Sequence, residues 1–286
     1  MNKKKKWNNI SKTNSLFSLR KKYIDEFRDK NEFYELIFYI KGWTKSDCFI
    51  YENDSFEDED IEKFIKFKDE LKLKPIQYVT NSAFFYGLNF YVDENVLIPR
   101  PETELIVDNI VNDKNNYEVY ADVCTGSGCI AISLAHFKQI KKIFLTDISK
   151  NALIVANKNL ESLKVNGETV QGDFLEPLLS KKIKLNLLTI NPPYIDVNDE
   201  NIADLVRNNE PHLALFADDN GLHFYKELFS KLDNIMDTTK PFKVLCEFGF
   251  QQKEDIEQLY LKSGLKYKTE FEKDYQKYWR YFIISN

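Results

Sequence analysis

The sequence is poor in the residues that build disulfide frameworks and zinc sites. It has only three histidines and four cysteines among 286 residues, and the cysteines, at positions 48, 124, 129 and 246, form no Cys-x-x-Cys pair. Because a disulfide scaffold or a zinc centre needs such residues at close, regular spacings, neither is expected. We therefore predict a protein that works without a bound metal.

Long apolar runs are also absent. No stretch of the sequence approaches the roughly 20 apolar residues that a membrane-spanning helix needs. The basic residues within positions 1–6 are followed by polar residues, whereas a secretory signal continues into an apolar core. The sequence therefore predicts no membrane partner and a cytoplasmic location.

An overall excess of positive charge is missing as well. Lys and Arg total 40 against 45 Asp and Glu, so the net charge is -5 and gives no general preference for nucleic acid. Residues 1–22 are a local exception, with eight positive charges and no negative one. We predict a solvated arm there, and electrostatic contact with an RNA-rich partner is the alternative.

Length and apolar spacing predict two domains. A chain of 286 residues exceeds the commonest domain size, which favours one medium domain together with a smaller one. Apolar residues within positions 23–71 recur at helical spacings, so we predict a small all-helical N-terminal domain over residues 1–82. Residues 83–92 are aromatic and β-branched, and they predict a β-hairpin connector over residues 83–98.

Residues 99–286 alternate short apolar strands with amphipathic helices, which predicts an α/β domain with a mostly parallel, seven-stranded sheet. The last two strands are too close in sequence for a helical crossover, so we expect an antiparallel hairpin at the edge of the sheet. The expected strands are 118–123, 142–146, 168–171, 185–190, 242–247, 266–271 and 279–284. The expected helices are 101–112, 129–138, 149–163, 222–238 and 252–262.

The first of these strands leads into a glycine-containing turn and then into an apolar helix. The turn reads Cys124-Thr125-Gly126-Ser127-Gly128. Glycines at such a turn let a ligand approach the backbone, and the start of the helix offers free N–H groups. The spacing is not Gly-x-Gly-x-x-Gly, so a dinucleotide pyrophosphate is not the favoured ligand. A tight turn with a purely structural role is the alternative.

Acidic residues follow the next two strands. Asp147 stands 21 residues after Gly126, where a carboxylate can accept hydrogen bonds from ribose hydroxyls; its alternative role is to cap the helix that begins near Ser149. Asp173 can accept from an adenine amino group while Phe174 covers the ring, and its alternative is an ordinary turn residue. Together with the glycine turn, these strand ends predict a nucleoside site.

The fourth strand runs into Asn191-Pro192-Pro193-Tyr194, a segment suited to holding a planar amide or aromatic amine. The lone pair of such a nitrogen is delocalised, so its hydrogens must be held for the lone pair to be oriented. The side-chain carbonyl of Asn191 and the backbone carbonyl of Pro192 can each accept one N–H, and the two prolines stiffen the turn. Tyr194 can cover the substrate plane.

These motifs carry a resemblance. Residues 122–128, Asp147 and residues 191–194 resemble the motifs of class I S-adenosyl-L-methionine-dependent methyltransferases that modify exocyclic or amide nitrogens. The segments 75–78, 85–92, 96–104, 210–216 and 219–225 resemble signatures of the HemK/PrmC-type glutamine methyltransferases. Asn81 stands where that family usually has glycine, and because asparagine tolerates positive φ we expect the turn to be kept.

The resemblance implies a Rossmann-like methyltransferase domain over residues 99–286 and a substrate-docking role for residues 1–82. It implies methylation of the glutamine in the Gly-Gly-Gln tripeptide of class I peptide chain release factors, with S-adenosyl-L-methionine as methyl donor. By position, residues 124–128, Asp147, Phe174 and Asn191 would line the cofactor. Residues 191–194 would hold the glutamine. We expect a monomer with no direct nucleic-acid partner.

The expected mechanism is in-line transfer of the sulfonium methyl to the glutamine nitrogen, with Asn191, Pro192 and Tyr194 as the catalytic residues. No strong base is required, because neutral carbonyl oxygens can stabilise the charge that appears on nitrogen. Arg100 is expected to anchor the segment 96–104 rather than to take part in the chemistry.

Two other functions fit parts of the pattern. A methyltransferase acting on adenine in DNA or guanine in ribosomal RNA uses similar tetrapeptides for flipped bases, but it would need a basic face. A non-enzymatic module that senses S-adenosylmethionine would have a broken acceptor site, whereas residues 191–194 are intact.

Overall fold

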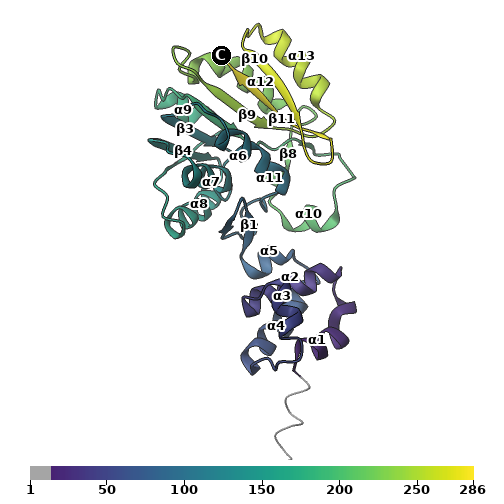
Figure 1. Cartoon of the computed structure of the whole chain (residues 1–286). Coiled ribbons are helices and arrows are strands. Elements are labelled where there is room, and N and C mark those ends of the chain that lie inside the picture. The colour runs from purple at the N-terminus through teal and green to yellow at the C-terminus, as the bar shows by residue number, and fades with distance from the viewer. Residues whose placement is uncertain (1–13) are drawn as a thin grey trace, which may run out of the picture. The chain divides into compact units, whose positions relative to one another are not determined.

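The structure is a computed structural model that describes residues 14–286 (Figure 1). The chain divides into two compact units, of which the first ends at Asn81 and the second begins at Ser82. Residues 1–13, which contain much of the predicted basic arm, lie outside the described residues. No helix within residues 14–286 combines the length and the apolar character needed to cross a membrane.

The first unit is helical, as predicted. Its buried core contains Phe33, Leu36 and Phe64, all on helices that show the apolar spacing seen in the sequence. The last helix ends at Thr80, and the φ of 49° at its C-cap residue, Asn81, confirms the expected positive value. The helices are α1 (Leu16–Tyr23), η1 (Ile24–Glu26), α2 (Lys30–Lys41), α3 (Lys45–Ile50), α4 (Asp58–Glu70) and α5 (Ile76–Thr80).

The second unit contains a seven-stranded sheet in the order β10-β11-β9-β6-β3-β4-β5. Strands β9, β6, β3, β4 and β5 are parallel, while β11 runs antiparallel to β9 and pairs with β10 as the predicted edge hairpin. The strands are β3 (Val119–Val123), β4 (Lys142–Asp147), β5 (Glu168–Gln171), β6 (Leu187–Ile190), β9 (Lys243–Glu247), β10 (Lys268–Lys273) and β11 (Trp279–Ser285).

Helices cover both faces of this sheet (Figure 1). Alternate strand residues enter two separate cores; in β6, for example, Leu187 faces one core and Leu188 the other. Helices α6 (Glu104–Val111), α7 (Cys129–Phe137) and α8 (Lys150–Ser162) contribute to the core of Leu187. Helices α9 (Glu176–Ser180), α12 (His223–Ile235) and α13 (Lys253–Ser263) contribute to the core of Leu188. The predicted α/β class is confirmed.

The main helices and strands lie within three residues of their predicted bounds. The predicted hairpin is present as β1 (Ala83–Phe85) paired antiparallel with β2 (Leu88–Phe90), and it belongs to the second compact unit. Five short elements beyond β5 have no counterpart in the prediction, because each of them is too short to show a hydrophobic periodicity. They are α9, β7 (Ile195–Asp196), α10 (Asp204–Asn209), α11 (His212–Leu215) and β8 (Phe216–Ala217), and a further short helix, η2 (Pro101–Thr103), precedes α6.

Candidate active site

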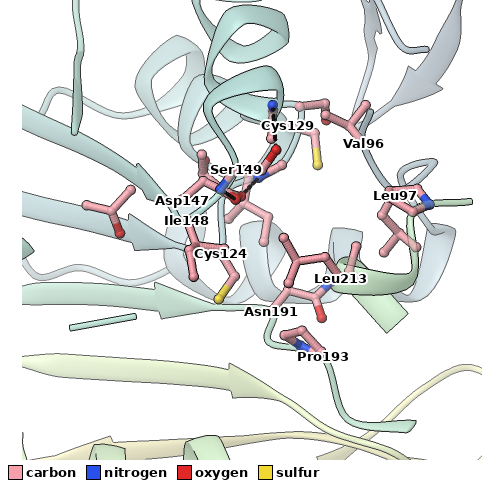
Figure 2. Close-up of a pocket in the computed structure, with 18 of the residues that line it drawn as sticks. Val96, Leu97, Cys124, Cys129, Asp147, Ile148, Ser149, Asn191, Pro193 and Leu213 are labelled. Carbon is pink, nitrogen blue, oxygen red and sulfur yellow. Dashed lines mark hydrogen bonds between the residues drawn. The ribbon is translucent and has the colours of Figure 1, made fainter. Parts of the chain in front are cut away.

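A cavity lies where the parallel strands end (Figure 2). Strands β6, β3, β4 and β5 are neighbours, so their carboxyl ends share one edge of the sheet, where α/β folds bind ligands. The predicted site residues found on the cavity wall are Cys124, Thr125, Gly126, Ser127, Asp147, Asp173, Phe174, Asn191 and Pro193. The predicted residues Gly128, Pro192 and Tyr194 are not among those that line it.

The two glycines of the turn after β3 have different roles. Gly126 has φ of 54°, and a Cβ added there would meet no other atom within 4 Å, so the absence of a side chain keeps the cavity open. Gly128 has φ of 80°, and a Cβ there would lie 3.0 Å from Ile132 and 3.1 Å from Leu145. Gly126 therefore leaves room for a ligand, whereas Gly128 permits close packing of α7 on the sheet.

Asp147 fixes the glycine turn through backbone hydrogen bonds. One carboxylate oxygen accepts from the N–H of Gly126 at 2.9 Å and the other from the N–H of Ser149 at 2.9 Å. Burial raises the pKa of Asp147, and these backbone donors act in the opposite direction. Each carboxylate oxygen has a second lone pair, so the group can order the turn and still accept from a ligand hydroxyl.

A buried network of side-chain hydrogen bonds also holds the glycine turn. The carboxylate of Asp122 accepts from the hydroxyls of Thr125 at 2.6 Å and Thr189 at 2.5 Å. Because Thr189 donates its only hydroxyl hydrogen to Asp122, the hydroxyl of Tyr120, 2.6 Å away, donates to Thr189. Burial raises the pKa of Asp122 to about 6, although both threonine hydrogen bonds lower it. The network joins the turn to strands β3 and β6.

Asp173 and Phe174 stand beyond β5. The Asp173 side chain is exposed on the cavity wall and makes no hydrogen bond or ion pair with any residue of the described chain. Phe174 is buried, with its ring 4.9 Å from that of Phe224, which also lines the cavity. The Asp173 carboxylate, which is available to accept hydrogen bonds from a ligand, therefore stands directly before an aromatic residue of the cavity wall.

Asn191 follows β6 and is half-buried on the cavity wall. Within residues 14–286, no group hydrogen-bonds its side-chain amide, and none donates to the carbonyl of Pro192. Tyr194 lies off the wall, and its hydroxyl donates to Glu247 at 3.2 Å. Contact of the Tyr194 ring with a substrate stays a prediction.

The segment before η2 forms another part of the wall. Figure 2 shows Val96 and Leu97 across the cavity from Asp147 and Cys124. Arg100 donates to Glu210 at 2.6 Å, and the N–H of Ile98 donates to the other Glu210 oxygen at 3.2 Å.

Glu210 is buried, so it holds this segment against the stretch that leads into α11. This contact agrees with the anchoring role expected of Arg100.

Several wall residues were not predicted as site residues. They are chiefly Val96, Leu97, Thr103, Leu213, Ala214 and Phe224, and most are apolar. Residues 96–104, 210–216 and 219–225 did stand out in the sequence by resemblance, which could have identified these positions. The apolar side chains in those segments do not by themselves indicate a binding site, because an apolar residue in the sequence is equally well explained by packing in the core.

The residues present fit an adenosine-type ligand with a polar tail. The available Asp173 carboxylate, the buried Asp147 carboxylate and the open space at Gly126 supply acceptors and room at the strand ends. Within residues 14–286 there is no group of three or more His, Cys, Asp or Glu side chains arranged to hold a metal ion.

Comparison with known proteins identifies the family. The Methyltransferase small domain family matches residues 101–214. The release factor glutamine methyltransferase of Mycoplasma mycoides is 46% identical over 215 residues, which are 74% of this chain and 76% of that protein. The protein of the same name from Staphylococcus aureus is 36% identical over 234 residues, 81% of this chain and 84% of that protein. The chain belongs to the release factor glutamine methyltransferase family.

Solved structures agree with the fold of this release factor glutamine methyltransferase family member. A methyltransferase from Pyrococcus furiosus superimposes with a TM-score of 0.53 and 16% identity, covering 80% of this chain and 98% of that one. A methyltransferase complexed with SAH gives a TM-score of 0.51 and 10% identity over 70% of this chain and 54% of that one. At such identities the likeness concerns the fold, and it confirms the Rossmann-like methyltransferase sheet.

Asn159 on α8 holds the glycine turn after β3 in place in this family member. It is fully buried; its carbonyl accepts from the N–H of Tyr91 at 2.7 Å, and its amide donates to the carbonyls of Tyr91 and Ser127, each at 2.9 Å. Asn159→Asp would turn a donor into an acceptor that faces two carbonyls. We expect the free energy of unfolding to fall by about 3 kcal/mol.

Urea unfolding would measure this loss, and titration with S-adenosylhomocysteine should show weaker binding because the carbonyl of Ser127 is no longer held. Asn157→Asp is the matched control, since Asn157 is exposed on the same helix and its amide donates to the carbonyl of Leu153 and the hydroxyl of Thr169, not to the glycine turn. Equal effects of the two substitutions would contradict the role given to Asn159.

Proposed function

We propose that this protein methylates the side-chain amide nitrogen of the glutamine in the Gly-Gly-Gln motif of class I peptide chain release factors, with S-adenosyl-L-methionine as methyl donor. The observation that carries the proposal is the Asn191 side chain. It stands on the cavity wall with no hydrogen-bond partner among residues 14–286, at the edge where the glycine turn, Asp147 and Asp173 also meet. Family membership supports the same activity.

The proposed cofactor-binding residues divide by chemistry. Asp147 would accept from the ribose hydroxyls, and Asp173 would accept from the adenine amino group. The open backbone at Gly126 would let the cofactor pass close to the turn. Phe174 would cover the base, together with Phe224 against which its ring packs. When bound, S-adenosylmethionine would supply the electrophilic methyl group.

The proposed acceptor-binding residues work by orientation. The Asn191 carbonyl would accept one N–H of the glutamine amide, and the Pro192 carbonyl would accept the other. Two fixed acceptors would hold the planar amide and turn its nitrogen lone pair toward the cofactor. The bond from sulfur to methyl would break as the bond from nitrogen to methyl forms, and the same oxygens would stabilise the positive charge that appears on nitrogen. The nitrogen would lose its extra proton afterwards, so no strong base is needed to begin the reaction.

The wall near Asn191 suggests why glycines would flank the target glutamine. Leu97, Leu213 and Ala214 line the same cavity, and Figure 2 shows Leu213 beside Asn191. These apolar side chains offer no polar partner to a charged neighbour of the glutamine. A backbone without side chains would pass such walls most easily.

The decisive experiment incubates the protein with methyl-labelled S-adenosylmethionine and four separate acceptors. These are a class I release factor, the same factor with the tripeptide glutamine changed to alanine, duplex DNA and ribosomal RNA. We expect label in the unmodified release factor alone. Equal labelling of the two release factors would remove the glutamine assignment, and label in DNA or RNA would favour methylation of a base.

We also propose that the protein acts as a monomer in the cytoplasm, where its release factor partner takes part in translation. Residues 1–82 would dock the body of the release factor, a role that rests on the family resemblance.

A further inference from the structure

Tyr194 is held at both of its ends by residues that do not line the cavity. Its hydroxyl donates to Glu247 at 3.2 Å, and its backbone carbonyl accepts from the side-chain amide of Gln252 at 3.0 Å. Glu247 ends strand β9, and Gln252 directly precedes α13. Two further elements of the fold therefore meet the last residue of the segment 191–194.

Gln252 uses its entire amide group as a bridge. Its nitrogen donates to the carbonyls of Tyr194 and Asn220, at 3.0 and 3.1 Å, and its oxygen accepts from the N–H of Gly249 at 3.0 Å. One side chain thus joins the segment 191–194, the turn before α12 and the loop after β9. Because both amide hydrogens are engaged, no similar side chain of equal length can replace all three bonds.

Glu247 makes the matching link at the hydroxyl end. It is buried, and its second carboxylate oxygen accepts from the hydroxyl of Thr103 at 2.6 Å. Thr103 lines the cavity on the side of the segment 96–104. Burial raises the pKa of Glu247, while the Thr103 hydrogen bond, the nearby Arg280 charge and the Tyr194 hydroxyl lower it. Glu247 therefore couples Tyr194 to a wall residue of the opposite segment.

We propose that Gln252 and Glu247 are positioning residues for methyl transfer: they fix Tyr194 at its carbonyl and hydroxyl, and so set where Asn191 and Pro192 hold the acceptor amide. Neither residue lines the cavity, so they act through Tyr194 and not by contact with substrate. The inference rests on the proposed function of residues 191–194. It adds two residues to which neither the motifs nor their spacing assigned any role.

Gln252→Glu tests the carbonyl end with one atom changed. The variant keeps the oxygen that accepts from Gly249, but it places a second acceptor against the carbonyls of Tyr194 and Asn220. Gln251→Glu is the matched control, because Gln251 is an exposed neighbour that makes no hydrogen bond within the described chain and receives the same charge change.

We expect Gln252→Glu to lower kcat for release factor methylation by about 10- to 100-fold, since a small misplacement of the acceptor removes alignment. The Kd for S-adenosylhomocysteine should stay within about twofold of wild type, as should all constants of Gln251→Glu. Equal kcat for the two variants would overturn the inference, and so would a loss of Gln252→Glu activity that only mirrors weaker cofactor binding. A wild-type protein that leaves the release factor unlabelled would instead remove the proposed function.

A second pair of variants decides the matter if Gln252→Glu does not fold. Tyr194→Phe and Glu247→Gln both disturb the hydroxyl hydrogen bond. If Glu247 acts through Tyr194, the double variant should lose less kcat than the product of the two single losses. Fully multiplicative losses would overturn the inference.

Discussion

Asn191→Ala is expected to lower the turnover of release factor methylation about 100- to 1,000-fold, the usual cost of removing one fixed polar group from a transition state. Asn191 stands on the cavity wall, and its amide has no partner among residues 14–286, so its loss breaks no hydrogen bond of the described structure. The substitution therefore removes the proposed acceptor for the glutamine amide, while the folded protein keeps its own contacts.

Asn191→Ala should lower turnover but leave cofactor binding nearly unchanged. Asp147, Asp173 and the turn at Gly126 remain in place, so calorimetric titration with S-adenosylhomocysteine should give a Kd within a few-fold of wild type, a change of about 1 kcal/mol or less. Asn116→Ala is a suitable control, because Asn116 is exposed and does not line this cavity. Near-normal turnover of Asn191→Ala would show that the acceptor amide is held by other groups.

The site residues at the strand ends could be predicted, because a polar residue directly after an apolar strand is visible in the sequence and parallel strands bring such residues to one edge of the sheet. Asp147 follows an apolar strand, and Asn191 follows another; parallel strands bring their carboxyl ends to one edge, so sequence order alone placed both residues on one cavity. The edge hairpin followed from the short connection between the last two strands. Such inferences need no knowledge of side-chain contacts.

The supporting contacts could not be predicted, because each joins residues distant in sequence. Glu210 meets Arg100, Asn159 meets Ser127, and Gln252 meets Tyr194, yet none of these pairs has a spacing that indicates contact. Glu247 is a partial exception, since an acid that ends an apolar strand repeats the pattern of Asp147. A closer comparison of strand ends could have identified Glu247 as a candidate, but not its partners.

Gly221→Ala is expected to produce the second large effect. A Cβ at this position would overlap the carbonyl oxygen of Tyr194 and lie 2.5 Å from the amide nitrogen of Gln252. Gly221 also has φ of 77°, which a residue with a side chain adopts only with strain. We expect the free energy of unfolding to fall by about 3 kcal/mol and turnover to fall about 100-fold, because the backbone at Tyr194 must move.

Gly264→Ala separates the two causes of this effect. Gly264 has nearly the same φ, 78°, but a Cβ there would meet no atom within 4 Å. This control should therefore show only the conformational cost, about 1 kcal/mol in urea unfolding, with unchanged turnover. The difference between the two variants then measures the steric contacts with Tyr194 and Gln252. If Gly221→Ala matched Gly264→Ala in both stability and turnover, the position of Tyr194 would not limit the reaction, because its carbonyl could move without loss of methyl transfer.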